Sequence, residues 1–582
     1  MSAAVERQSL LLLAGATGLC TWAVIQVGPL FEFGEIQPLT LGVYAFTAIC
    51  TLRFTGECFL ALASGLEWFS ARSGTGKSGT ARWAKHKELK SEFCPKDAGP
   101  FWGMSAIARK KLFIDTASNA YVVGPSGSGK GHTAVVPMIF TISHSKVIMD
   151  FKPELLTICK RGLEQRGQRV IGLNPFGMYT DIVGPSDCLN VLDVITDSLN
   201  TPNGLRNVLG DARELTLQLY EDPQGGAGDD QFWRNGTRKI IALVCMIECM
   251  MQGYKAALSD VALLLDDRDA LEIRLRSIAG VDFEDKPDPE GPHMFELSDW
   301  ADHHEEAELE IFLKTVRART RSLLKTMSES AKTFGSFLEG AHQALEPYGF
   351  GQLSSAMGRS SFNIDDLKCG DCALNIFIVG DASRSDATEK FFGLMQWYLQ
   401  LKLKRHPNKD VPVYLINDEA SNYSIFGLVS LMTWGRSFSI RTIQYFQNFT
   451  SYTEKHGSNA VEVLNSESEV KLFLPGQRSV PTIKKIVEIL GEQSLMVAGL
   501  SPANSNEGIK ENMSESGRPL MTEDEVRRTQ HGILIVRQQR PILQTPVSYS
   551  EIVPLRTLAD NNPHHGKAFL KPVKLKLKLP KH

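Results

Sequence analysis

The chain shows three hydrophobic patterns, and the most informative is that of a layered α/β domain. Between about residues 119 and 450, short apolar runs end in polar residues, which is typical of buried strands in a parallel sheet. The runs are "AYVVG", "KVIMD", "RVIGL", "LNIFIV", "VPVYLIN" and "IRTIQYFQN". Helical segments lie between them, so the sequence predicts a mostly parallel sheet with helices on both faces.

The second pattern is purely helical and interrupts the first between residues 201 and 340. "QFWRNGTRKIIALVCMIECMM" has apolar residues at helical spacing, and "ADHHEEAELEIFLKTVRARTRSLLKTM" is amphipathic. The apolar stripe of the latter consists of Leu309, Phe312, Val316, Leu323 and Met327. We therefore predict an all-α domain over 201–340, inserted between two parts of the sheet domain at 71–200 and 341–555.

The third pattern is continuous hydrophobicity near the N-terminus. Residues 10–31 carry no charge and are long enough to cross a bilayer, and a second apolar stretch runs from residue 39 to about residue 69. The lysines and arginines that follow it indicate a cytoplasmic flank. The sequence thus predicts a transmembrane hairpin over 1–70, with both termini in the cytoplasm. A cleaved signal peptide is the alternative for the first stretch, and the second stretch directly after it argues against this.

Composition and charge limit the kinds of partner. The 582 residues carry a formal net charge of -3, so contact with a nucleic acid would depend on a local basic surface. One candidate is a basic stripe on the amphipathic helix, formed by Lys314, Arg317, Arg321 and Lys325. Such stripes also occur as plain solvated faces. The basic tail over 556–582 would bind acidic lipid or nucleic acid or be simply solvated, and we favour the solvated tail.

Two stretches resemble a phosphate-binding loop, whose pattern is G-x-x-x-x-G-K-[ST] between a strand and a helix. The first, "SGTGKSGTARWA" at 73–84, has Ala71 in place of the first glycine and follows the predicted membrane span. The second, "YVVGPSGSGKGHT" at 121–133, has Gly124, Gly129 and Lys130 in register. We predict that the second stretch binds nucleotide phosphates and that the first does not.

The residues predicted to hold the phosphates are contiguous. They are Gly124, Pro125, Ser126, Gly127, Ser128, Gly129, Lys130, Gly131 and His132. Successive backbone N–H groups would surround phosphate oxygens, and Lys130 would reach the outer phosphates. Gly131 departs from the pattern, because it lacks the Ser or Thr hydroxyl that normally helps to hold magnesium. Thr133 is close in sequence but out of register, so other residues or water would have to hold the metal.

A pair of acids follows the run "VPVYLIN", as in a Walker B strand. Asp418 would orient Mg2+, and Glu419 would polarise the attacking water. Two acids after a strand are weak evidence alone and strong evidence beside a phosphate loop. Asp150 and Gln447 also follow predicted strands, and ligands bind where the carboxyl ends of parallel strands meet. The sequence thus predicts an ATP and Mg2+ site, with Asp418 as the metal ligand.

The order of these motifs resembles that of the type IV secretion coupling proteins, the TraG/TraD-type conjugation ATPases. The similar stretches are "SGTARWA", "GPSGSGKG", "MDFKPEL", "NPFG", "FWRNGTRKIIALV", "LINDEASN", "IQYFQN" and "GRPLMTEDEVRR". They extend from the predicted hairpin to about residue 550. A loop ending in Gly-Lys-Gly is usual in this family, whereas Asn417 stands where the family usually has an aliphatic residue.

The resemblance implies an inner-membrane protein with a RecA-like P-loop ATPase core, assembled as a homohexamer around a channel. It implies DNA, a relaxase or effector proteins as cargo, and channel components of the type IV secretion system and membrane lipid as further partners. The all-α domain of such proteins touches cargo, which strengthens the nucleic-acid interpretation of the basic stripe. The matched positions imply that Gln447 senses the γ-phosphate. Arg436 would be an arginine finger toward the neighbouring subunit, with an Arg that caps the core as the alternative.

Three functions fit these observations to different degrees. In the first, the protein is a motor whose ATP hydrolysis drives transfer, which Glu419 favours. In the second, it is a receptor or docking platform that binds cargo and nucleotide but hydrolyses little, which Gly131 favours. A chromosome-partition translocase, the third, shares the core but not the short two-span anchor and the helical insertion.

Substitution of the two candidate lysines distinguishes the two loops. Lys130→Ala should abolish ATP binding, because it removes the ammonium group that reaches the outer phosphates. Lys77→Ala should leave ATP binding intact. Titration with a fluorescent ATP analogue measures both variants, and loss of binding in Lys77→Ala with retention in Lys130→Ala would reverse the assignment.

Overall fold

The computed structural model describes residues 79–89, 99–115, 118–221, 230–281, 299–501, 510–564 and 572–579. The chain divides into two compact units. The smaller unit contains Val487–Thr522 together with the described residues up to Arg82, and the larger unit contains Trp83–Ile486 and the chain from Glu523 onward.

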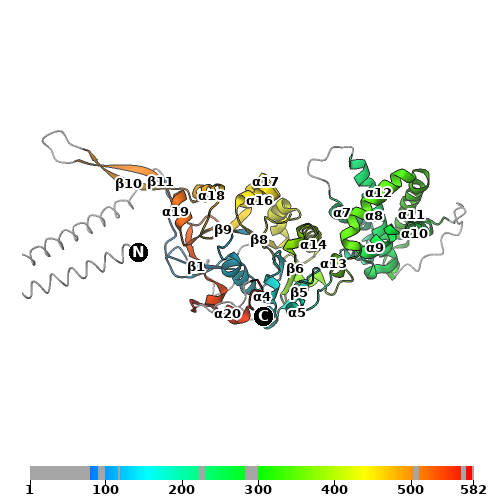
Figure 1. Ribbon diagram of the computed structural model, residues 1–582, viewed down its shortest axis with the longest axis horizontal. Helices are drawn as coiled ribbons and strands as arrows, with labels where there is room; N and C mark the ends of the chain where they lie inside the picture. Colours follow the sequence, from blue (N-terminus) through cyan, green and yellow to red (C-terminus); the bar gives the residue numbers. More distant parts are fainter. Residues whose placement is uncertain are drawn as a thin grey trace, which may run out of the picture. The chain divides into compact units, whose positions relative to one another are not determined.

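The larger unit is built on an eleven-stranded sheet in the order β2-β1-β13-β12-β9-β3-β8-β7-β4-β6-β5 (Figure 1). The strands from β9 to β5 in this order run parallel. They are β3 (Asn119–Val123), β4 (Lys146–Asp150), β5 (Arg169–Leu173), β6 (Leu374–Val379), β7 (Val413–Asn417), β8 (Ile440–Phe446) and β9 (Ser468–Phe473). All except β9 coincide with the apolar runs, so the predicted α/β core with a mostly parallel sheet is confirmed.

Helices cover both faces of this sheet, because alternate side chains of each strand point to opposite sides. On one face, Ile148 and Tyr414 share a hydrophobic cluster with residues of α3 (Val136–Thr141) and α4 (Leu155–Glu164). On the other face, Val147 and Leu415 line a small cavity with residues of α14 and α15. The helices of this second face are α14 (Ser385–Arg405), α15 (Leu428–Trp434), α16 (Phe449–His456) and α17 (Ser458–Glu467).

Four antiparallel strands extend the sheet beyond β9, and the sequence did not predict them. They are β12 (Gly532–Val536), β13 (Ile542–Thr545), β1 (Phe101–Ser105) and β2 (Lys111–Phe113). Each is short, and β1 pairs with β13 across more than 400 residues of sequence, as Met104 opposite Thr545 shows. A local pattern cannot indicate such a pairing.

A two-stranded ribbon in the smaller unit corrects a prediction. We expect a polar loop over 501–519, but β11 (Lys510–Pro519) pairs antiparallel with β10 (Glu492–Ser501). The register runs from Glu492 opposite Pro519 to Ser501 opposite Lys510. The sequence of β11, "KENMSESGRP", has no apolar alternation, so its backbone pairing leaves no hydrophobic signal.

The second half of the first loop candidate pairs with this ribbon. Thr80 forms an antiparallel bridge with Gln493, and the N–H of Ala81 donates to the carbonyl of Glu492 at 2.9 Å. A Cβ at Gly79 would lie 2.2 Å from the same carbonyl oxygen. Position 79 therefore requires glycine, because the backbone there lies directly against the backbone of Glu492. Residues 73–78, including Lys77, lie outside the described residues.

Helices α7 to α12 gather into a cluster of their own (Figure 1). They are α7 (Leu205–Leu219), α8 (Asp230–Gln252), α9 (Leu258–Asp266), α10 (Arg268–Ala279), α11 (Glu306–Glu329) and α12 (Ala331–Gly349). α8 and α12 approach each other closely at Gly236, where a Cβ would stand 2.3 Å from the ring of Phe337. The hydroxyl of Thr237 also donates to the carbonyl of Phe337 at 3.2 Å. The motif "FWRNGT" therefore fits the packing of α8 on α12.

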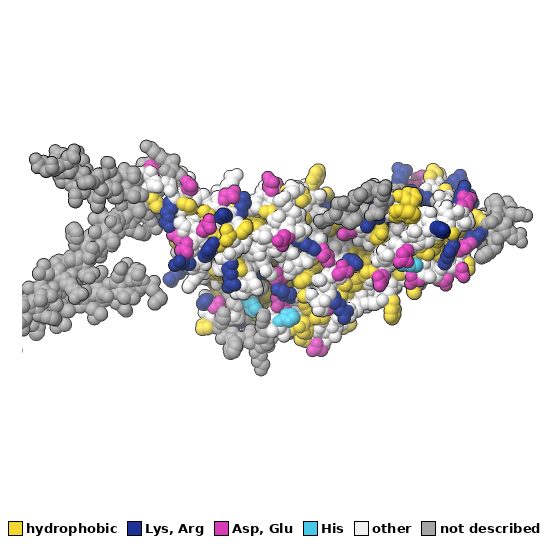
Figure 2. All heavy atoms as spheres, turned by 45° about the horizontal axis from the view of Figure 1, so that its top comes forward, with side chains coloured by type: hydrophobic (Ala, Val, Ile, Leu, Met, Phe, Trp, Pro, Cys, Tyr) yellow, Lys and Arg dark blue, Asp and Glu magenta, His cyan; other side chains and the backbone are white. Residues whose placement is uncertain are grey.

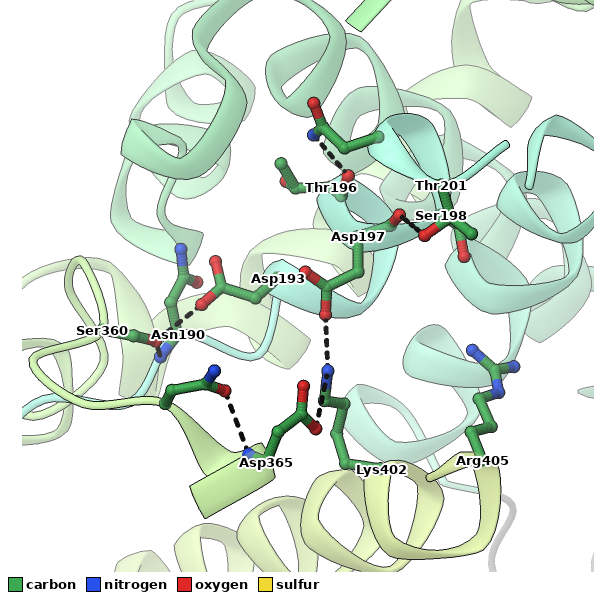
Figure 3. Close-up of polar contacts among 12 residues, drawn as sticks. Asn190, Asp193, Thr196, Asp197, Ser198, Thr201, Ser360, Asp365, Lys402 and Arg405 are labelled. Atoms are coloured by element: carbon green, nitrogen blue, oxygen red, sulfur yellow. Dashed lines mark hydrogen bonds and ion pairs between the residues drawn. The ribbon is translucent and has the colours of Figure 1, made fainter. Parts of the chain in front are cut away.

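A polar network joins this helical cluster to the sheet through α14 and α6 (Asp193–Asn200) (Figure 3). Lys402 of α14 contacts Asp197 of α6 at 2.9 Å, and Arg405 donates to Asp211 of α7 at 3.0 Å. The hydroxyl of Ser360 donates to Asp193 at 2.6 Å. These charged contacts attach the helices that follow β5 to the helix that follows β6.

The C-terminal stretch corrects a second prediction. In "KLKLKL" at 574–579, Leu575 and Leu577 are buried in the hydrophobic cluster, and the lysines are exposed. β15 (Leu575–Lys576) pairs in parallel with β14 (Ile552–Val553). The alternation of lysine and leucine has the period of a strand with one buried face. The prediction of a solvated tail is therefore wrong for residues 572–579.

The predicted transmembrane hairpin remains a prediction. Both apolar stretches, 10–31 and 39–69, lie outside the described residues. Among the helices of the described ranges, none is long and apolar enough to span a membrane. The predicted domain boundaries likewise stay predictions.

Two glycines of the helical cluster offer a matched test of its packing. Gly236→Ala should lower the free energy of unfolding by about 1–3 kcal/mol, because the new methyl group collides with Phe337. Gly335→Ala on α12 meets no described atom within 4 Å and should raise the free energy of unfolding by about 0.5–1 kcal/mol. Urea denaturation measures both, and equal shifts in the two variants would show that Gly236 is not a packing contact.

Candidate nucleotide site

The phosphate loop follows β3, and its glycines are required by its backbone. Gly127 and Gly129 have φ angles of 82° and 77°, which L side chains rarely adopt. A Cβ at Gly124 would lie 2.8 Å from the hydroxyl oxygen of Ser128. The N–H of Gly124 donates to the carbonyl of Phe446 at 3.0 Å, which fixes the start of the loop to the end of β8. The backbone of the loop therefore requires glycine at these positions.

The remaining predicted phosphate-binding residues line the open side of the loop or begin its helix. Ser126 is exposed, and Pro125, Gly131 and His132 are half-buried. A π-helical turn over Gly131–Val135 leads into α3, with Pro137 in its first turn. Pro137 has no N–H to donate, so it is tolerated near a helix start. The predicted helix after the loop is therefore present, and it is short.

The loop lysine and the two acids after β7 come together, as the sequence predicts. Lys130 Nζ lies 3.2 Å from Glu419 Oε2 and 3.7 Å from Asp418 Oδ1. All three side chains are buried. The contact exists because β3, β8, β7 and β4 are neighbours in the sheet, so that their carboxyl ends form one edge. A buried ammonium group therefore faces two buried carboxyl groups.

Two further side chains contact Glu419. Lys152, from the turn after β4, donates to Glu419 Oε1 at 2.7 Å, and Gln447, after β8, donates to Oε2 at 3.3 Å. Burial acts to raise the pKa of Glu419, but the charges of Lys130 and Lys152 outweigh it and lower this pKa to about 2. Glu419 is therefore ionised at neutral pH. The sequence identified Gln447 but assigned no role to Lys152, although "MDFKPEL" places it directly after a strand.

Asp418 has the properties of a metal ligand. Its Oδ1 atom is buried and has no hydrogen-bond partner among the described residues. Burial raises the pKa of Asp418 to about 6, although the charge of Lys130 acts to lower it. Lys130 Nζ lies 3.7 Å from this oxygen, too far for a hydrogen bond, so the oxygen keeps lone pairs that a cation can bind. Asp418 therefore fits a hard divalent cation such as Mg2+.

Asp150 has a structural role, although it ends β4 at the same edge. Its two carboxylate oxygens accept the N–H groups of Glu154 at 3.2 Å and Leu156 at 3.0 Å, at the start of α4. Burial raises the pKa of Asp150 to about 8, and the backbone hydrogen bonds oppose this shift. Asp150 thus satisfies the free N–H groups of a helix start.

Arg436 lies away from the other predicted residues within its own chain. It is exposed in the short turn Gly435–Phe438, directly before the amino end of β8. Because β8 runs parallel to β3, the phosphate loop lies at the opposite edge of the sheet, about 20 Å away over the length of β8. Arg436 cannot reach the phosphate loop of the same chain.

The basic stripe of α11 is largely compensated by its neighbours. Lys314 pairs with Glu310 at 2.8 Å, and Lys325 lies 3.8 Å from Glu329. Arg321 donates to the carbonyl of Ala279 at 3.0 Å. Figure 2 shows basic and acidic side chains interspersed on one face of the molecule. Arg317, the fourth member, is half-buried, so these contacts favour the interpretation as a solvated face.

The chain is similar to proteins of type IV secretion. Residues 76–568 match a family model described as "Type IV secretory system Conjugative DNA transfer". Protein VirD4 of Rhizobium radiobacter is 29% identical over 183 residues, which cover 28% of this chain and 25% of that protein. Protein VirD4 of Agrobacterium fabrum is 28% identical over 129 residues, 20% of this chain and 18% of that protein. The matched stretches thus span a quarter or less of these relatives.

Solved structures share the fold. The bacterial conjugative coupling protein TrwBdeltaN70, in its unbound monoclinic form, superposes with a TM-score of 0.51 at 15% identity, over 81% of this chain and 96% of that one. The plasmid coupling protein TrwB in complex with the non-hydrolysable ATP analogue ADPNP gives a TM-score of 0.50 at 15% identity, over 85% and 100% of the two chains. At this identity the likeness concerns the fold alone.

Proposed function

The chain belongs to the type IV secretory system conjugative DNA transfer family, and from this premise we propose that it is an ATPase coupling protein. It recruits relaxase-bound DNA, effector proteins or both, and it delivers them to a type IV secretion channel by means of ATP hydrolysis. The meeting of Lys130 with Asp418 and Glu419 carries the proposal, because it joins a phosphate-binding lysine to the two acids that hydrolysis needs.

The roles of the side chains follow from their contacts. The loop N–H groups and Lys130 hold the phosphates of ATP. Asp418 holds Mg2+, which when bound neutralises charge on the β- and γ-phosphates. Glu419, ionised because two lysines flank it, accepts a proton from the attacking water. Gln447 contacts Glu419 and is placed to respond to the γ-phosphate. TrwB, whose fold this chain shares, is known in complex with an ATP analogue and with a GTP analogue, which supports a nucleoside triphosphate as the ligand.

The cellular setting is part of the same proposal. Two spans within residues 1–70 anchor the protein in the bacterial inner membrane, with both termini and the ATPase core in the cytoplasm. Channel components of the secretion system and membrane lipid are its further partners there. Six copies form a ring, in which the exposed Arg436 of one copy completes the site of the next. Lys314, Arg317, Arg321 and Lys325 remain a candidate contact with DNA.

A receptor that binds nucleotide and cargo but hydrolyses little is the second candidate. The observation in its favour is Gly131, where the usual hydroxyl ligand of magnesium is missing. Such a protein would dock cargo at the channel and leave the transfer work to another ATPase.

Substitution of Glu419 separates the motor from the receptor. In the full-length chain, Glu419→Gln should lower DNA-stimulated ATP turnover at least about 100-fold, because it removes the general base. ADPNP binding should persist. Phosphate release and ADPNP titration measure the two properties, and Glu454→Gln, an exposed residue of α16, is the control. A wild-type chain that binds ADPNP but shows no turnover with DNA would establish the receptor instead.

A mixing experiment tests whether Arg436 acts between copies. Arg436→Ala and Lys130→Ala should each abolish turnover of the assembled protein. A mixture of the two variants should regain part of it, because some sites combine an intact Lys130 with an intact Arg436 from the neighbour. ATP turnover of the mixture at several ratios measures this. Normal turnover of Arg436→Ala alone would instead assign this arginine to capping of the core.

A further inference from the structure

The glycine at position 131 has no conformational reason to be a glycine. It lies in the helical turn that begins at the phosphate loop, and its φ is not in the left-handed region. A Cβ built there meets only one described atom within 4 Å, which is Glu154 Oε1 at 3.7 Å. A serine would therefore fit at position 131. The hydroxyl of this serine would project toward Oε1 of Glu154.

The carboxylate of Glu154 is not used by its own helix. Glu154 is the residue before α4, a position where acidic side chains commonly cap the helix. Its side chain makes no capping hydrogen bond within the described chain, because Asp150 accepts the free N–H groups instead. Glu154 therefore does not act as a helix cap. Its carboxylate instead faces the phosphate loop at Gly131.

The C-terminal segment holds this carboxylate in place. The Nδ2 group of Asn562 donates to Glu154 Oε2 at 2.5 Å, and Asn562 Oδ1 accepts the N–H of His564 at 2.8 Å. Asn562 is buried, so its amide is fixed between these two partners. Oε2 of Glu154 is thus engaged, which leaves Oε1 facing Gly131.

Further contacts fasten the same segment to the site. Arg161 of α4 donates to Asp560 at 2.9 Å, and the ring of Tyr549 stacks on His132 with centroids 5.3 Å apart. Residues 549–564 therefore pack along α4 up to the phosphate loop. Hydrogen-bond partners behind a metal ligand fix its orientation in this way.

We propose that Glu154, held by Asn562, is the second carboxylate of the magnesium site and takes the place of the hydroxyl that Gly131 lacks. The inference rests on the proposed nucleotide site. It is supported by Asp418, whose buried Oδ1 atom has no hydrogen-bond partner among the described residues. Two carboxylates and phosphate oxygens form the hard oxygen set that magnesium prefers.

The test measures metal affinity directly in the full-length chain. Mn2+ is titrated into the ADPNP-bound protein, and free Mn2+ is followed by electron paramagnetic resonance. Glu154→Gln should weaken Mn2+ affinity about 10-fold or more, in the range seen when groups around a metal are removed. The amide keeps the volume of the side chain and an oxygen for Asn562. ADPNP affinity without metal should not change.

A double variant supplies the decisive comparison. Glu154→Gln combined with Gly131→Ser should regain most of the lost Mn2+ affinity, because the hydroxyl returns to its usual place. Asn562→Ala should give a smaller loss than Glu154→Gln. Glu164→Gln, an exposed residue of the same helix, should bind Mn2+ like the wild type.

Two results would overturn the inference and leave the nucleotide site standing. One is wild-type Mn2+ affinity in Glu154→Gln, and the other is a loss that Gly131→Ser does not restore. A wild-type chain that fails to bind ADPNP at all would overturn the proposed function itself, and the inference with it.

Discussion

The carboxylate of Glu419 connects the separate segments of the candidate site. It contacts Lys130 from the phosphate loop, Lys152 from the turn after β4 and Gln447 from the end of β8. Its backbone has a φ of 51°, a conformation that side-chain-bearing residues seldom adopt and that clusters at functional sites. Lys130 and Lys152 compensate the buried charge of the acids.

This convergence depends on the order of the strands and on little else. The neighbours β3, β8, β7 and β4 bring their carboxyl ends to one edge, although β3 and β4 lie far from β7 and β8 in the sequence. The hydrogen bond from Lys152 to Glu419 spans 267 residues, and the one from Asn562 to Glu154 spans 408. The helical cluster between β5 and β6 leaves this edge undisturbed, because it joins the sheet through α6 and α14.

Local patterns predicted those features whose physical cause is local. Buried strands need apolar runs, and a phosphate loop needs glycines at fixed spacing, so β3 to β8, Lys130 and Asp418 could be read directly. The role of Lys152 could not, because a lysine after a strand is common and only its distant partner distinguishes it. The strand β11 left no signal, since a polar ribbon is held by backbone pairing. The alternation in "KLKLKL" was available, but its charge suggested a solvated tail.

Gly131 is weaker evidence for low ATP hydrolysis than the loop pattern alone suggests. The Ser or Thr of the loop pattern supplies an oxygen ligand for magnesium near the phosphates. Another residue can supply the same oxygen, because magnesium requires the ligand atom and not a particular residue. At position 131 the helical backbone would accept a serine, yet the neighbouring space faces the carboxylate of Glu154. If the oxygen comes from Glu154, then the missing hydroxyl is no sign of weak hydrolysis, and the receptor alternative loses its main support. The C-terminal segment then contributes to the nucleotide site, because Asn562 holds the other oxygen of the Glu154 carboxylate.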